Sequence, residues 1–489
     1  MNTIGLWMLV ALGFLTLTTG LPVWALLCGV SMAFAGFGIA LGALDINALL
    51  PISGRILGLL ENDLLQALPL YVLVGMLLQR LGIADDLFIS LSRWFAPIGA
   101  ARQLATMAVG AILAPMNGSI ASSASMLTRL VSPNLVSSKL ASKSSQKNEA
   151  NRQVALVSTA ATIGIVVPPS LVLILLGDAM FRAHTEASNL PGFSLGNSRI
   201  ISTQDVFNAA LLPAFLVLFL WTAIAWWMHR RDDKAQASTP PTPTPPTRAR
   251  TSRCVIAIAV IVTLLGGVYL GKLFAVEAAA AGACCLIVAA LLTKGFGRPT
   301  WAGLLNDTIQ LSGALFALLV GATTFSMVFR SFGTDRWLIA SISQLPMSAM
   351  TVALVILLFV ATCAWVLDAF ELIFVIIPII APLLIAKLGD PQQAAVLLLL
   401  VLQLSFLIPP MGYAVLIVRD TIATQSTSGS KILYTLLPYI VAQVFVTIMV
   451  FMFPAVVHQL DAQKADAVRS TTLSDEEIEA KMRAMSGQK

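Results

Sequence analysis

Charged residues are scarce in this sequence. Only 11% of its 489 residues are Asp, Glu, Lys or Arg, whereas 57% are hydrophobic, and the mean hydropathy is +0.87. A soluble core cannot bury that much apolar surface, so the composition excludes a soluble globular protein and predicts an all-α polytopic membrane protein. The formal net charge of +6 comes from Lys and Arg in short segments between apolar runs. That distribution sets membrane topology and excludes nucleic-acid binding.

Histidine is also rare, and the motifs of enzymes are missing. The three histidines, His184, His229 and His458, fall outside the apolar spans, and neither His-Glu-x-x-His nor Gly-x-Ser-x-Gly occurs. An enzyme embedded in the membrane would need titratable groups that converge at membrane depth. The five cysteines lie in or beside apolar runs, without the spacing of metal ligands. We therefore expect no enzyme activity, no catalytic residues and no cofactor.

Two long apolar runs are each interrupted by a pair of prolines. The first pair is Pro168-Pro169, and the second, Pro409-Pro410, follows 241 positions later (409 − 168). Each pair removes two backbone donors and disfavours helix at the preceding residue, so the run must unwind inside the membrane. Unwound backbone survives there only when it is buried in protein or lines a cavity. Paired broken helices indicate the binding site of a secondary transporter, whereas the alternative is a kink that only shapes packing.

A polar interruption precedes each proline pair. The run 101–131 is interrupted at Asn117-Gly118-Ser119, and the run 349–387 is interrupted at Asp368. We interpret each as the tip of a re-entrant hairpin. The runs with the proline pairs, 153–182 and 393–419, are then broken helices that span the membrane.

The two halves of the chain also share sequence. Arg80-Leu-Gly-Ile-Ala-Asp resembles Arg330-Ser-Phe-Gly-Thr-Asp, and the two glycines are 251 positions apart (333 − 82). Five spans in each half make the repeats inverted, with the N-terminus outside, the basic linker inside and the C-terminus outside. The predicted units are a first repeat 1–231, a proline-rich cytoplasmic linker 232–252, a second repeat 253–456 and a polar tail 457–489.

At these positions the chain resembles the large permease subunit of tripartite ATP-independent periplasmic (TRAP) transporters. The matching blocks are Leu68 to Gly75 with Arg80-Leu-Gly-Ile, Asn117 to Ser123, Thr162 to Ser170, Val276 to Gly282, and Asp368 to Pro382 with Leu407 to Gly412. Family members often carry Ser-Gly-Ser-Ser at the first tip, whereas this chain has Asn117-Gly118-Ser119-Ile120.

The resemblance implies a sodium-coupled, elevator-type importer in a bacterial inner membrane. In such a membrane, the outside location that the charge distribution gives both termini is the periplasm. It implies two partners: a small four-helix membrane subunit, expected as a separate chain, and a periplasmic binding protein that delivers a small organic solute, one that bears a carboxylate. Two alternatives stay open. One is a related elevator carrier for dicarboxylates or other anions that works without a binding protein, and the other is a channel.

Each half offers oxygen ligands for a sodium ion, which takes about five or six of them. The predicted sodium-binding residues lie at the tips and breaks: Asn117, Gly118, Ser119, Gly164, Val166, Pro168, Asp368, Leu407, Pro409 and Gly412. Asp368 and Glu371 also have the spacing of a helix cap, so capping is an alternative role for Asp368.

Hydroxyl groups cluster at and after the first tip. Because helix N-termini carry free N–H groups and partial positive charge, these hydroxyls can help to hold a solute carboxylate. The predicted solute-binding residues are Ser119, Ser122, Ser123 and Ser170. The alternative is that such serines bond back to their own helix or pack against a neighbour.

Overall fold

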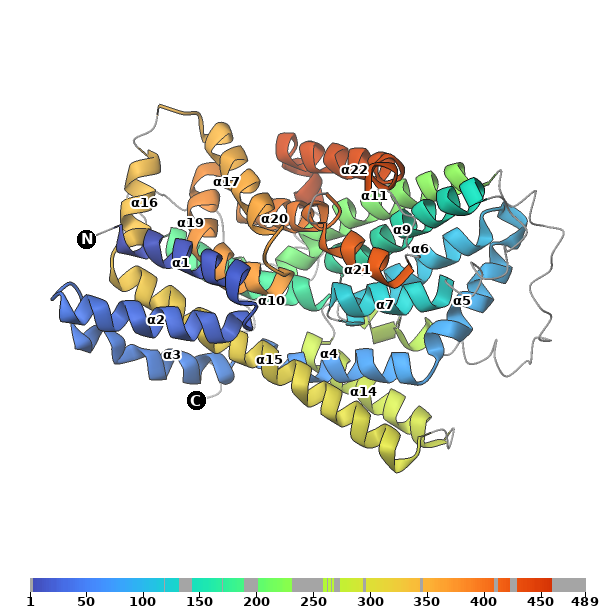
Figure 1. Ribbon diagram of the computed structural model, residues 1–489, viewed down its shortest axis with the longest axis horizontal. Coiled ribbons are helices and arrows are strands. Elements are labelled where there is room, and N and C mark those ends of the chain that lie inside the picture. Colours follow the sequence, from blue (N-terminus) through green and yellow to red (C-terminus); the bar gives the residue numbers. More distant parts are fainter. Residues whose placement is uncertain are drawn as a thin grey trace, which may run out of the picture.

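The chain forms helices and no strands over the residues that the computed structural model describes (Figure 1). Helices suit a chain of apolar runs because each satisfies its own backbone hydrogen bonds. The described residues are 3–117, 119–131, 143–168, 170–188, 201–230, 258–261, 263–264, 266–267, 273–292, 296–343, 346–408, 412–422 and 429–459. The predicted linker 232–252 and residues 460–489 of the tail lie outside them.

The first half has helices at its predicted apolar runs, and the run 153–182 is divided between two of them. In chain order they are α1 Ile4–Thr19, α2 Val23–Ala40, α3 Pro51–Leu60, α4 Asp63–Arg80, α5 Ile83–Trp94, α6 Ala101–Leu113, α7 Ile120–Val131, α9 Lys143–Val166, α10 Leu171–Ala187 and α11 Thr203–His229.

The second half follows the same plan. Its helices are α14 Ala275–Leu292, α15 Arg298–Ser331, α16 Thr334–Ser343, α17 Ala349–Cys363, α18 Ala369–Glu371, α19 Ile377–Leu388, α20 Pro391–Ser405, α21 Tyr413–Ile422 and α22 Gly429–Met452. A π-helical turn, Leu372–Ile376, joins α18 to α19.

Several helices are long and apolar enough to cross a membrane. Among the described residues there are five, or seven when two bent pairs of helices are each counted as one span. One of these pairs consists of α9 and α10, which bend by 42° at the first proline pair. The chain is therefore a multi-pass membrane protein.

The segment 41–63 connects α2 to α4. It contains a 3-10 turn, Ile46–Leu49, followed by α3. Asp45 begins the turn by accepting a hydrogen bond from the backbone N–H of Asn47, and Pro51 stands at the first position of α3. Proline is tolerated at that position because its missing N–H would be unpaired there anyway.

Two left-handed glycines occupy equivalent places in the halves. Gly82 has φ 66° and separates α4 from α5, and Gly333 has φ 69° and separates α15 from α16. A positive φ is costly for residues with a Cβ, so glycine is the residue that suits both turns. The shared sequence around Arg80 and Arg330 therefore corresponds to one shared local structure.

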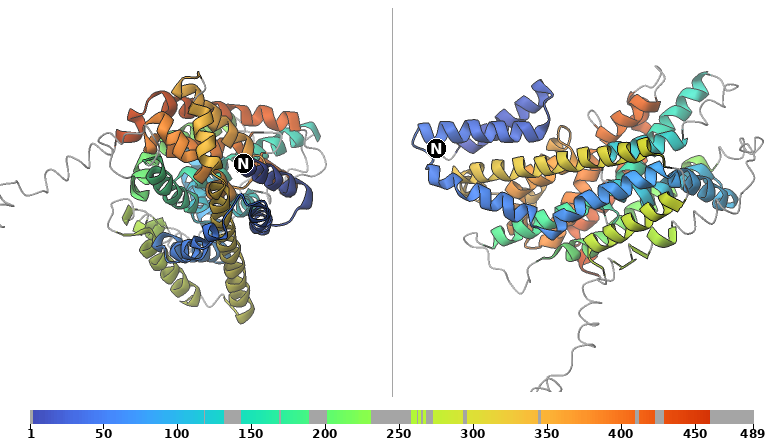
Figure 2. Two further views of the ribbon diagram at one scale, coloured as in Figure 1. Left: turned by 90° about the vertical axis from the view of Figure 1, so that its left-hand side faces the viewer. Right: turned by 90° about the horizontal axis from the view of Figure 1, so that it is seen from below.

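Packing contacts also occur in matched couples. Helix α4 packs against α14, and α15 packs against α2; α6 packs against α9, and α17 packs against α20. Across the halves, α9 packs against α22 and α20 against α11, while α10 packs against α19 and α21 against α7. Figure 2 shows the long helices α4, α14 and α15 running side by side in its right-hand view. Each of these helices thus has a counterpart with the corresponding neighbours.

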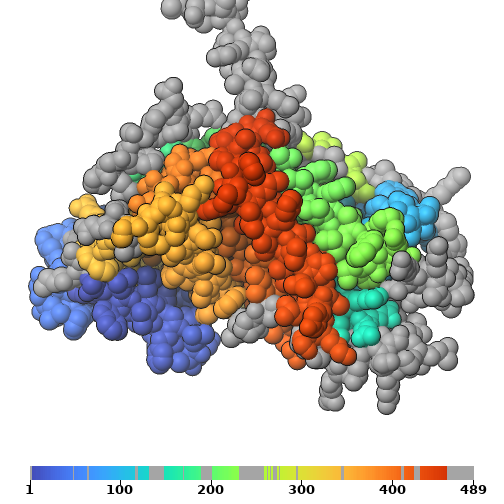
Figure 3. All heavy atoms as spheres, turned by 90° about the horizontal axis from the view of Figure 1, so that it is seen from above, coloured from blue at the N-terminus to red at the C-terminus, as the bar shows by residue number. Residues whose placement is uncertain are grey.

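One face of the molecule is crossed by α22. In Figure 3 this helix, in red, runs between second-half helices on one side and α11, in green, on the other. The ring of Trp221 on α11 meets Tyr439 on α22 edge-on, and its Nε1 donates a hydrogen bond to the Tyr439 carbonyl at 3.0 Å. These last helices of the two halves therefore pack against each other, and each also packs on the pre-break helix of the other half, α20 or α9.

Candidate functional site

The first tip lies directly against the helix that leads to the first proline pair. A short 3-10 turn, Ala114–Asn117, follows α6 and packs on α9. A Cβ added at Gly164 would lie 2.5 Å from the carbonyl carbon of Ala114, and one at Gly110 would lie 2.7 Å from the Ala160 carbonyl oxygen. Two glycines thus let backbone approach backbone. Gly164 thus lies against the turn that ends at Asn117, whereas Gly118 lies outside the described residues.

The first break frees two carbonyl groups in succession. In an unbroken helix the carbonyls of Gly164 and Ile165 would accept from residues 168 and 169, but both of these are prolines. The Ser170 hydroxyl donates to the Ile165 carbonyl at 3.0 Å and accepts from the Leu173 backbone N–H at 3.0 Å. The Gly164 carbonyl has lost its helical donor. Ser170 acts here as the cap of α10.

The second break follows the same pattern at equivalent positions. The carbonyls of Ser405 and Phe406 lose their helical donors because residues 409 and 410 are prolines. The Ala414 backbone N–H donates to the Phe406 carbonyl at 3.3 Å. In both halves, therefore, the second freed carbonyl finds a donor beyond the break, and the first one, at Gly164 or Ser405, has none from its own helix.

Gly412 and Leu407 face each other across the second break. A Cβ at Gly412 would lie 3.2 Å from the Leu407 carbonyl oxygen, so this close approach suits glycine. The ring of Tyr413 packs on that of Phe406, with centroids 6.3 Å apart. Of the residues predicted here, the structure brings Leu407 and Gly412 together, and Pro409 lies outside the described residues. Val166 ends α9, and Pro168 follows it at the first break.

The second tip lies beside the second break. Asp368 precedes α18, and its backbone N–H donates to the Glu371 carboxylate at 2.9 Å. This contact is the Glu371 half of a capping box, with the spacing that the sequence has. The Tyr413 hydroxyl lies within electrostatic range of both carboxyl groups. Because Tyr413 begins α21 just after the second break, the second tip and this break lie within electrostatic range of each other.

Some of the serines near the first tip are already hydrogen-bonded or buried. Ser119 is half-buried just before α7, and its carbonyl accepts from the Ser123 backbone N–H at 3.1 Å. The Ser122 hydroxyl accepts from Gln79 Nε2 on α4 at 2.6 Å, and Ser123 is buried. Of the four predicted serines, Ser119 and Ser122 retain exposed surface, whereas Ser123 and Ser170 are buried, so the first two are the better candidates for contact with a solute.

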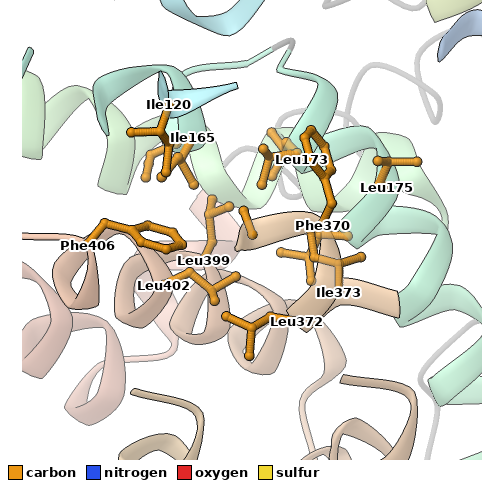
Figure 4. Close-up of a cluster of buried hydrophobic side chains, with 14 of the residues drawn as sticks. Ile120, Ile165, Leu173, Leu175, Phe370, Leu372, Ile373, Leu399, Leu402 and Phe406 are labelled. Carbon is orange, nitrogen blue, oxygen red and sulfur yellow. The ribbon is translucent and has the colours of Figure 1, made fainter. Parts of the chain in front are cut away.

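Both hairpins and both breaks share one apolar cluster. Figure 4 shows Ile120, which follows the first tip, beside Ile165 at the first break. In the same view Phe370, which follows the second tip, lies beside Leu173 just beyond the first break, and Phe406 comes from the second break. All five side chains are buried. The tips and breaks, far apart in sequence, thus converge in the interior of one helical group.

Two residues of this region escaped the sequence interpretation. Ser405 has no special side-chain chemistry, and only counting back four positions from Pro409 identifies its freed carbonyl. Tyr413 was missed because its place within electrostatic range of Asp368 depends on how the hairpin packs. Among the described residues, no group of three or more His, Cys, Asp or Glu could hold a metal ion.

Comparison with known families decides the class of the protein. Residues 9–456 match the family described as "Tripartite ATP-independent periplasmic transporter, DctM component". The chain belongs to this family. A TRAP large permease is a transporter subunit and not an enzyme, which agrees with the lack of enzyme motifs in the sequence.

Curated relatives of this TRAP permease transport different solutes, as their names state. The sialic acid TRAP transporter large permease protein SiaM of Vibrio cholerae is 22% identical over 90% of this chain and 94% of its own length. The ectoine/5-hydroxyectoine permease UehC of Ruegeria pomeroyi is 26% identical over 62% of this chain and 65% of its own. The C4-dicarboxylate permease DctM of Pseudomonas aeruginosa is 21% identical over 62% and 65%.

A solved structure has a similar fold. The crystal structure of the YdaH transporter of Alcanivorax borkumensis aligns with a TM-score of 0.56 at 16% identity, over 84% of this TRAP permease and 90% of that chain. At such low identity the likeness concerns the fold alone, an all-helical membrane transporter fold.

Proposed function

We propose that the chain is the large membrane subunit of a sodium-coupled importer for a small organic solute that bears a carboxylate. The observation that carries the proposal is the pair of equivalent breaks, each with a freed carbonyl, at Gly164 and at Ser405, next to a polar tip. Backbone carbonyls are hard neutral oxygens, which suit sodium and add no charge to a buried site.

Each sodium site would combine a tip with the break beside it. In the first half the site would use the Gly164 carbonyl with the backbone of Asn117 and Ser119. In the second half it would use Ser405, Leu407 and Gly412 with Asp368, whose carboxylate compensates a buried cation. Sodium ions would then be coupling ions, and no other cofactor is needed.

We propose an elevator mechanism on the basis of how the helices divide. The matched packing couples support an inverted repeat in which α2, α4, α14 and α15 form a scaffold. The hairpins and broken helices would form the moving domain. Polar contacts already cross this boundary: Gln79 donates to Ser122, and Asn62 Nδ2 donates to Asp178 at 3.1 Å. Such exposed or half-buried hydrogen bonds can be exchanged during a movement at small net cost.

The solute would bind between the tips, close to the N-terminal end of α7. Ser119 and Ser122 stand there, and the first N–H groups of a helix attract an anion. Two of the relatives are named for sialic acid and for C4-dicarboxylates, both of which carry carboxylates. We propose the same class of solute for this chain.

The proposed setting is a bacterial inner membrane with both termini in the periplasm. The partners would be a small four-helix membrane subunit and a periplasmic binding protein, as membership of the TRAP family leads us to expect. A carrier of related fold that works without a binding protein is the alternative, and dependence on the partner distinguishes the two.

Uptake by proteoliposomes tests this function. The chain and the small subunit are reconstituted together, and uptake of radioactive sialic acid, succinate and ectoine is measured with the cognate binding protein outside. We expect one of these solutes to accumulate only under an inward sodium gradient. Equal uptake with potassium on both sides, under a pH gradient alone, would refute sodium coupling. Full uptake without the binding protein would favour the alternative carrier.

A further inference from the structure

Gln403 is a buried amide in one of the most apolar helices of the chain. It lies on α20 two positions before Ser405, and its side chain is fully buried. Its Nε2 donates to the Thr162 carbonyl on α9 at 3.3 Å, and its Oε1 accepts from Gln443 Nε2 on α22 at 2.8 Å. Gln443 Nε2 also donates to the Leu400 carbonyl at 3.3 Å. Two buried glutamines thus link three helices.

The link joins equivalent points of the two broken helices. Thr162 and Gln403 each stand six positions before the first proline of a pair. Thr162 is two residues before Gly164, and Gln403 is two residues before Ser405, so the bond lies less than one turn from both freed carbonyls. A shift of either pre-break helix along its axis would strain this bond and move the other break.

A buried amide at this position lowers stability relative to leucine unless its hydrogen bonds have a role. Burying a polar group without its partner costs about 1–3 kcal/mol, and the neighbours of Gln403 on α20 are leucines and valines that carry no such cost. The same helix contains a second buried amide, Gln393, whose Nε2 donates to the carbonyls of Val450 and Phe451 at 2.9 and 3.0 Å. Gln393 holds α22 too, but it lies ten positions from Gln403.

We propose that Gln403 is a positioning residue that couples the two sodium sites. Through its bond to Thr162 it fixes the two pre-break helices relative to each other, so that sodium at one break sets the carbonyl geometry at the other. Sodium binding is then cooperative, with a Hill coefficient above 1 and at most about 2 for two sites. This inference rests on the proposed sodium-coupled function.

Equilibrium binding of radioactive sodium to the purified full chain, with choline replacing sodium at constant ionic strength, tests the coupling. Gln403→Met keeps the length and apolar packing of the side chain but cannot bond to Thr162 or Gln443. We expect its Hill coefficient to fall to about 1. Gln443→Met leaves the bond from Gln403 to Thr162 in place, so its Hill coefficient should fall less. Gln393→Met is the matched control, since it removes an equally buried amide on the same helix and should leave the Hill coefficient unchanged.

The outcomes separate this inference from the proposed function. If the unmodified chain binds no sodium, the proposed function fails and the coupling fails with it. If the unmodified chain binds sodium with a Hill coefficient of 1, the coupling alone is refuted. If binding is cooperative and Gln403→Met behaves like Gln393→Met, Gln403 is only a structural residue. A Gln403→Met protein that fails to fold is replaced by Gln403→Asn, whose shorter amide cannot span both partners.

Discussion

The guanidinium group of Arg330, at the end of α15, binds both carboxylate oxygens of Glu186 on α10. The second of these contacts measures 2.6 Å, and the same Nη2 donates to the Pro378 carbonyl on α19 at 3.1 Å. One side chain thus connects α15 to the helix after the first break and to the return arm of the second hairpin. Its counterpart in the first half, Arg80, instead pairs with Asp307, which lies on α15. The two equivalent arginines therefore have different partners. Arg330 binds residues of α10 and α19, whereas Arg80 binds a residue of α15, the helix against which its own helix α4 packs.

A thiol cross-link between positions 186 and 330 should block transport if the hairpin domain moves past α15. The double variant Glu186→Cys, Arg330→Cys is made in a background without the natural cysteines and is treated with a short bifunctional maleimide. We expect uptake to fall to background after cross-linking, because a covalent link holds the moving helix on the scaffold. Uptake before cross-linking is the reference.

Arg80→Cys with Asp307→Cys is the matched control. These residues lie on α4 and α15, which pack against each other within the proposed scaffold. Cross-linking them should leave uptake nearly unchanged. Normal uptake by the cross-linked 186–330 protein would contradict the division into scaffold and moving domain.

Alanine in place of the break prolines should impair sodium binding more than folding. Pro168→Ala with Pro169→Ala restores two backbone donors, so the Gly164 and Ile165 carbonyls return to helical hydrogen bonds. Transport should be abolished, and each single substitution should raise the sodium concentration for half-maximal uptake. Pro213→Ala, which changes a proline inside α11, is the control and should not shift the sodium requirement. If neither single variant changes the sodium concentration for half-maximal uptake, the break is only a kink that shapes packing.

Gly164→Ala should separate the first tip from α9. A Cβ there meets the backbone of Ala114 at 2.5 Å, which no side-chain rotation can relieve. Overpacking of this kind costs about 1–3 kcal/mol, and the unfolding temperature in detergent should fall accordingly. Gly313→Ala, at a helical glycine with open space around it, should instead raise stability by about 0.5–1 kcal/mol. Equal effects at the two positions would contradict the backbone contact.

The effect of a residue on its own stretch of backbone could be predicted from the sequence. Contacts between separate helices could not. The prolines located both breaks because a missing N–H has the same effect in any context. The sequence could not distinguish a serine that caps a helix from one that faces a solute, so the capping bonds of Ser170 came only from the structure. Likewise, the place of Tyr413 within electrostatic range of Asp368 depends on how the second hairpin packs.

Ser170→Ala distinguishes the two roles considered for this residue. Its hydroxyl donates to the Ile165 carbonyl and accepts from the Leu173 N–H, so its loss leaves two buried backbone groups unpaired. Loss of a serine cap costs about 1 kcal/mol of stability, and the unfolding temperature should fall. The solute concentration for half-maximal uptake should stay the same, whereas in Ser119→Ala, at the half-buried first tip, it should rise. A large rise in Ser170→Ala with stability unchanged would instead place its hydroxyl in direct contact with the solute.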